Sequence, residues 1–304
     1  MRHHPPLWGS GGQKGPGSTH LRDNYPLAIM AFLRRHSLII GIALMYAFTW
    51  SVHLSRAGVL PVQFPSVIYM LGGWGFALAA ILMTWITLGA EAVIALLKRF
   101  LIWRLDWKWY ASLLIIPLTY LLGIAAHALV TGSAPDLRLT AAYRAAGSPA
   151  SVIALVIPVF LADVLGNGEE IGWRGYALPR LQSRYSALYS ALVIGLIWAL
   201  WHIAIYIRSF NPVWFAWYVV SVIAKSVLIT WAYNGTRGSL LLATLYHAMW
   251  NTSGIFLPIT TRLPQADIGT YAYVVLSEVA VAAIITVLAG HEHLSRSQPR
   301  QAQA

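Results

Sequence analysis

Apolar segments long enough to cross a membrane recur eight times along this sequence. They cover approximately residues 37–54, 66–97, 109–131, 150–178, 187–208, 212–233, 238–258 and 270–290. A helix needs about 20 residues to span the hydrocarbon core of a bilayer. The sequence therefore predicts an all-α, polytopic membrane protein with about eight transmembrane helices. The second segment is long enough for its helix to tilt or to continue into the interface.

The composition supports this class and excludes others. Of the 304 residues 58% are hydrophobic and 10% are charged, whereas soluble domains contain about 25% charged residues. Cysteine is absent, which excludes disulfides, thiolate zinc sites and a cysteine nucleophile. The basic residues that give the chain its net charge of +11 lie beside apolar segments. We therefore expect the protein to interact with the bilayer and not with nucleic acid.

The distribution of Lys and Arg predicts the topology. With a cytosolic N-terminus, the segments on the cytosolic side carry fifteen of these residues and the opposite segments carry five. This asymmetry follows the positive-inside rule. It predicts an integral membrane protein, in the cell membrane, with an even number of spans and both termini in the cytosol.

The chain divides into four predicted regions. Residues 1–36 are a disordered basic tail, and residues 37–149 hold the first transmembrane helices. Cations alternate with tryptophans over residues 98–109, a composition typical of an interfacial helix. Residues 150–258 carry the polar motifs, and residues 259–304 contain the last transmembrane helix and a polar tail.

Three short motifs place polar side chains in these apolar segments. Inserting an ionisable group into a bilayer costs about 2.5–3.5 kcal/mol, so such groups are rare and usually functional. In each motif, polar or aromatic residues are spaced i, i+4 and share one helical face. The motifs are Glu169-Glu170-Ile-Gly-Trp-Arg174, Trp198-Ala-Leu-Trp-His202 and His247-Ala-Met-Trp-Asn251.

The two adjacent glutamates receive different roles. Glu170 and Arg174 have the spacing and order of a helical ion pair, and pairing offsets much of the cost of burying both. Glu169 points about 100° away from that partner. A carboxylate without a cation, in a medium of low dielectric constant, is suited to acid or base chemistry near neutral pH. We therefore assign structure to Glu170 and chemistry to Glu169.

The remaining polar residues complete a polar intramembrane cavity. His247 and Asn251 are two neutral donors on one face, which suits stabilisation of an oxyanion, and His202 is available to share the activation of water with Glu169. For these groups to meet, the fourth helix must continue past Glu169 to about Leu178.

Asp163 and Lys225 are further ionisable residues within apolar segments, beside Glu91, His127 and Glu278. Asp163 lies seven residues before Glu170, and we expect it to join the Glu170–Arg174 network. Lys225 lies in mid-span, either as a cation facing the cavity or as the partner of a carboxylate.

In this order across apolar helices, the three motifs resemble those of the CAAX protease and bacteriocin-processing family of intramembrane endopeptidases, which includes the type II CAAX prenyl endopeptidases. The resemblance covers residues 150–258, with Trp198 where the family often has Phe. It implies that Glu169 and His202 activate a water that attacks a peptide carbonyl. It also implies that His247 and Asn251 stabilise the oxyanion and that the substrate is a membrane-associated peptide or protein.

Two alternatives remain open. Glu169, His202 and His247 together could bind zinc with an open position; the absence of an H-E-x-x-H helix favours the mechanism without a metal or other cofactor. A non-catalytic scaffold or immunity protein of the same fold is the second alternative. A scaffold that had lost catalysis should lack at least one motif residue, and none is missing from the sequence, which favours the enzyme.

Overall fold

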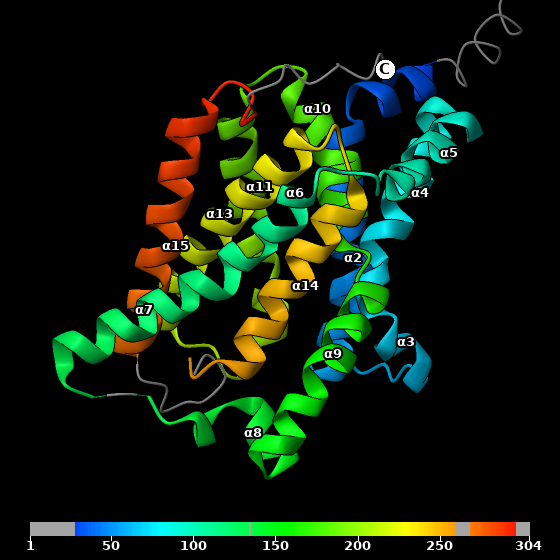
Figure 1. The fold of residues 1–304 in the computed structure, drawn as a ribbon. Helices are drawn as coiled ribbons and strands as arrows, with labels where there is room; N and C mark the ends of the chain where they lie inside the picture. Colours follow the sequence, from blue (N-terminus) through cyan, green and yellow to red (C-terminus); the bar gives the residue numbers. More distant parts are fainter. Residues whose placement is uncertain (1–27, 134, 260–267, 296–304) are drawn as a thin grey trace, which may run out of the picture.

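The structure is a computed structural model that describes residues 28–133, 135–259 and 268–295 (Figure 1). Within these ranges the regular structure is helical and contains no strand. Residues 28–35 are helical, although the sequence predicts a disordered tail up to residue 36. The first 27 residues of that tail lie outside the described residues.

The helices follow one another with short connections. Their bounds are α2 (Ser37–Arg56), α3 (Ser66–Met70), α4 (Gly75–Leu88), α5 (Ala90–Lys98), α6 (Trp107–Ala111), α7 (Ile115–Thr131), α8 (Ala141–Ala146), α9 (Pro149–Gly166), α10 (Leu178–Gln182), α11 (Ala187–Trp201), α12 (Ile203–Tyr206), α13 (Pro212–Gly235), α14 (Leu240–Phe256) and α15 (Ile268–Ala289).

Six helical stretches of the described chain are long and apolar enough to cross a membrane. They cover residues 37–56, 107–131, 149–166, 187–206, 212–235 and 268–289. The second and seventh predicted spans are represented by shorter helices, an apolar one over Gly72–Leu88 and α14. The prediction of a polytopic all-α membrane protein is thus confirmed.

Two of the predicted spans are interrupted. The segment 66–97 is no single long helix, because Gly89, with a φ of 88°, ends α4 before α5 begins. The segment 150–178 is no continuous helix either. The helix α9 ends at Gly166, Asn167 is extended, and the chain becomes helical again in a π-helical turn over Ile171–Ala177 that leads into α10.

The predicted interfacial helix also differs from the structure. Residues 102–106 are not helical, and helix resumes at Trp107. Leu101 and Trp107 are each 71% exposed. The composition expected at the headgroup layer is therefore present on an irregular, exposed connection.

Close approaches between backbones hold the helices around the site. A Cβ on Gly195 of α11 would lie 2.7 Å from the Cα of Ile223 in α13. Small residues of this kind let membrane helices pack closely. Figure 1 shows α14 running beside α9 in the middle of the molecule, with α11 and α13 behind it. The segment after α9 contacts α11, α13 and α14 through the side chains of Glu169, Arg174 and Glu170, respectively.

The end of the described chain packs against the start of α11. The backbone N–H of Ala187 donates to the carbonyl of Glu292 at 2.8 Å, and that of Leu188 to His291 at 3.0 Å. The side-chain amide of Asn234 donates to the carbonyl of His293 at 2.8 Å. The start of α2 and the end of α15 lie on this same side of the molecule (Figure 1). Their cytosolic location stays a prediction.

Candidate active site

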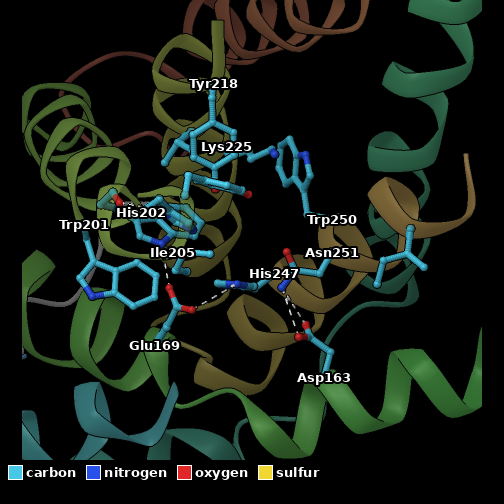
Figure 2. A pocket seen from close by; sticks show the side chains of 14 residues that line it. Asp163, Glu169, Trp201, His202, Ile205, Tyr218, Lys225, His247, Trp250 and Asn251 are labelled. Carbon is cyan, nitrogen blue, oxygen red and sulfur yellow. Dashed lines mark hydrogen bonds and ion pairs between the residues drawn. The ribbon is translucent and has the colours of Figure 1, made fainter. Parts of the chain in front are cut away.

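A cavity of about 220 Å³ lies between α9, α11, α13 and α14. Its lining includes Glu169, His202, His247 and Asn251, the four side chains that the sequence singles out (Figure 2). They come from three separate segments of the chain, with His247 and Asn251 both on α14. The interruption at Asn167–Gly168, rather than a continuous fourth helix, brings Glu169 to the cavity.

The predicted ion pair between Glu170 and Arg174 is present in the structure. Arg174 Nη1 donates to Glu170 Oε1 at 3.0 Å, and both side chains are buried. Arg174 Nη2 also donates to the hydroxyl of Ser226 at 3.2 Å. Arg174 therefore joins the segment after α9 to the middle of α13.

Glu170 has a second partner that the sequence did not predict. Its Oε1 accepts a hydrogen bond of 2.8 Å from His247 Nδ1. A carboxylate has only acceptors, so the hydrogen is on Nδ1 of the imidazole. Glu170 thus fixes the orientation of His247 as well as the position of Arg174.

Glu169 has a different environment from its neighbour. Its Oε2 accepts a hydrogen bond of 2.7 Å from Trp198 Nε1. Its Oε1 lies 4.0 Å from His247 Nε2, which is too far for a direct hydrogen bond. One oxygen is therefore fixed by an indole, while the other remains available in the cavity.

His202 is held in one tautomer by its own helix. Its Nδ1 lies 2.8 Å from the carbonyl oxygen of Trp198. Because a carbonyl can only accept, Nδ1 carries the hydrogen, and Nε2 of the neutral ring is left as an acceptor. The imidazole is thus available as a base at the cavity.

Asn251 is oriented by Asp163. Its Nδ2 donates to both carboxylate oxygens of Asp163 at 3.2 Å, and Figure 2 shows the pair at the edge of the cavity. Asp163 was expected to join the Glu170–Arg174 network, but in the described part of the chain its carboxylate accepts from Asn251 instead, while Glu170 and Arg174 pair with each other. The spacing of seven residues places Asp163 and Glu170 on one face only in a continuous helix, whereas α9 ends at Gly166 and Asn167 is extended.

Trp198 is a site residue that sequence reasoning missed. Besides its bond to Glu169, its ring lies 5.1 Å from that of His247 and 5.3 Å from the guanidinium of Arg174. The signal was available, since a buried indole N–H usually finds a hydrogen-bond partner.

The zinc alternative requires three ligands that converge. Among the described residues, no three His, Asp or Glu side chains lie together as a group that could hold a metal ion. His247 Nδ1 is engaged by Glu170, and only its Nε2 faces Glu169. Glu169, His202 and His247 line one cavity but do not fit a three-ligand site in this conformation.

Comparison with known proteins supports the resemblance seen in the motifs. Residues 148–253 match the family described as type II CAAX prenyl endopeptidase Rce1-like. A curated relative, CAAX prenyl protease 2 of Methanococcus maripaludis, is 35% identical over 114 residues, which are 34% of this chain and 42% of that protein. The chain thus matches about two fifths of the length of that relative. The resemblance predicted from the three motifs is confirmed over these residues.

Proposed function

We propose that this membrane protein, whose residues 148–253 match the Rce1-like family, is an intramembrane endopeptidase. One observation carries the proposal: four polar side chains with complementary roles line a single cavity among apolar helices. A bilayer interior excludes such groups unless they are used or paired. The proposed reaction is hydrolysis of a peptide bond in a membrane-associated peptide or protein.

Glu169 and His202 activate the attacking water in this proposal. Glu169 Oε1 and His202 Nε2 are the acceptors left free by the contacts of Trp198. An acceptor in hydrogen-bond reach of water takes its proton as the oxygen attacks the carbonyl carbon. The same proton is then delivered to the leaving amine when the carbon–nitrogen bond breaks.

His247 and Asn251 stabilise the oxyanion of the tetrahedral intermediate. Asn251 retains a second N–H beside the one that bonds Asp163. With Nδ1 donating to Glu170, His247 offers an N–H at Nε2 only as the doubly protonated ring. Donors fixed before the reaction stabilise developing charge without reorganisation. Glu170 fixes His247, and Asp163 fixes Asn251.

The substrate and the setting follow from the family and the composition. The relative's name connects that protein with prenylated substrates, and we extend to this chain only a substrate held at the membrane. The bilayer of the cell membrane is the proposed partner, with both termini in the cytosol.

The test is cleavage of a quenched fluorogenic peptide library by protein purified in detergent. We expect wild-type protein and Glu91→Gln, a change of an exposed glutamate on α5, to cleave the same peptides. Glu169→Gln should remain folded and lose turnover. Activity that persists with a chelator supports a mechanism without a metal.

Two other results would change the proposal. Activity that is lost with the chelator and restored by zinc would make Glu169, His202 and His247 metal ligands. Absence of cleavage by wild-type protein across a library that a related peptidase cleaves would favour the non-catalytic scaffold.

A further inference from the structure

A lysine faces the cavity from the middle of a membrane-spanning helix. Lys225 is the fourteenth residue of α13, far from both ends of this 24-residue helix. Lysines near helix ends reach the headgroups with their long side chains, but mid-span this route is too long. Lys225 instead lines the cavity that holds Glu169 and His247 (Figure 2).

The ammonium group of Lys225 lies near two aromatic rings, and no hydrogen bond joins it to another side chain or backbone group of the described residues. Lys225 Nζ lies 4.9 Å from the centre of the Trp250 ring and 5.9 Å from that of Tyr218. In the part of the chain that the structure describes, no carboxylate lies within 4.0 Å of it. Ring faces attract a cation but accept none of its three N–H groups in an ordinary hydrogen bond.

The buried side chain of Glu278 fixes the ring of Trp250, the aromatic platform under the ammonium group of Lys225. Glu278 Oε1 accepts from Trp250 Nε1 at 2.9 Å, and Oε2 accepts from the hydroxyl of Ser221 at 2.5 Å. Glu278 also interacts with Lys225 electrostatically. The carboxylate thus balances the charge of Lys225 while its oxygens are taken by other donors.

The lysine is adjacent to the residues of the site. Ser226, the next residue of α13, accepts a hydrogen bond from the guanidinium of Arg174, and Arg174 pairs with Glu170. Trp250 of the platform precedes Asn251 directly. A group bound by Lys225 therefore shares the small cavity with the groups that act on the peptide bond.

We propose that Lys225, supported on Trp250, binds a carboxylate of the peptide substrate inside the cavity. This inference rests on the proposed function and assigns it a specificity determinant. The carboxylate is either the free C-terminus of the peptide or an acidic side chain, and both offer two oxygens to an ammonium group. Binding it fills the donors that the aromatic platform leaves open.

The test compares matched peptides that differ only in this charge. The peptide cleaved fastest by wild-type protein is made with a C-terminal acid, with a C-terminal amide, and as the amide with one internal glutamate. We expect kcat/KM for a carboxylate form to exceed that of the plain amide by about tenfold to 100-fold. Lys225→Met should abolish this difference between the carboxylate forms and the plain amide, whereas Lys225→Arg should retain it. Lys98→Met, a change of an exposed lysine on α5, should leave both the difference and the rate for the amide unchanged.

A binding measurement separates this inference from the proposed function. N-acetyl-leucyl-leucine, as the acid and as the amide, is titrated into wild-type protein and Lys225→Met. Tighter binding of the acid to wild-type protein alone supports the carboxylate site even when no peptide is cleaved. Equal affinity of acid and amide for wild-type protein, or an unchanged preference in Lys225→Met, overturns it.

The variant also removes the charge that balances Glu278. For this reason the double variant Lys225→Met/Glu278→Gln is measured beside the single one. If both discriminate acid from amide as wild-type protein does, while only Lys225→Met is destabilised, Lys225 serves Glu278 as a counter-ion and binds no substrate.

Discussion

Adjacent glutamates in this protein are distinguished by their hydrogen-bond partners. Glu170 is shared by Arg174 and His247, whereas Glu169 receives an indole N–H and otherwise faces the cavity. The i, i+4 spacing predicted the contact with Arg174. The contacts with His247 and Trp198 join helices far apart in the sequence, and no local pattern encodes them.

Replacing Glu170 should destabilise the protein more than replacing Glu169. Glu170→Gln leaves the buried guanidinium of Arg174 without its anion, a loss of about 3–5 kcal/mol in the free energy of unfolding. Denaturant or thermal unfolding in detergent measures it. Asp136→Asn, which breaks the exposed pair with Arg138, should change stability little. Equal destabilisation by Glu169→Gln and Glu170→Gln would contradict this division of roles.

Trp198 should act through its N–H on the position of Glu169. Trp198→Phe keeps an aromatic ring beside His247 but removes the hydrogen bond to Glu169. Because hydrogen bonds to charged groups contribute about 1.5–3 kcal/mol, we expect kcat to fall about 10- to 150-fold with KM little changed.

The control for this variant is Trp50→Phe. Trp50 donates an equivalent indole bond to the carbonyl of Trp201 and does not line the cavity. Steady-state kinetics and unfolding are measured for both variants. A loss of kcat in Trp50→Phe as large as that in Trp198→Phe would show that the effect reflects reduced stability of the fold and not the position of Glu169.

At the scale of helices, sequence predicted where apolar segments lie but not where they break. The break after α9 follows Gly166-Asn167-Gly168, and glycine or asparagine after an apolar run is a helix stop signal. The apolar residues resume after this stop, so the apolar segment 150–178 was predicted as one helix. The side chain of Asn167 accepts the backbone N–H of Glu169 at 2.9 Å and so starts the next segment.

Gly168 should be required for the position of Glu169. A Cβ on Gly168 would lie 3.0 Å from Ala77 Cβ and 3.1 Å from Trp74 Cα, so alanine forces the segment away from α4. Displacement of a catalytic group by about 1 Å can cost about 100-fold in rate. The contacts at Gly168 require a shift of only a few tenths of an ångström, so we expect a smaller loss of kcat in Gly168→Ala, about two- to tenfold, measured by steady-state kinetics.

Gly166→Ala is the matched control for that substitution. A Cβ on Gly166, at the end of α9, has no neighbouring atom within 4 Å. This variant should retain wild-type kinetics, because alanine is well tolerated in a helix. A comparable loss of kcat in both variants would mean that chain flexibility, rather than the approach to α4, matters at this break.

For the whole molecule, the predicted topology is open to direct measurement. The chain contains no cysteine, so a single introduced thiol reports without background. Ser183→Cys lies after α10 and Ser133→Cys lies after α7, both at exposed positions. An impermeant thiol reagent added to intact cells should label Ser133→Cys only, and added to inverted membrane vesicles it should label Ser183→Cys only. The reverse pattern would place both termini outside.

The contact between the chain end and α11 sets an order of events during biosynthesis. The first N–H groups of a helix need partners from outside it, and two of those in α11 are satisfied by Glu292 and His291. Ribosomes add about 5–20 residues per second, so these partners are made on the order of 5–20 s after α11 itself. The N-terminus of α11, the helix that ends directly before His202, therefore gains these two partners only after α15 has been translated.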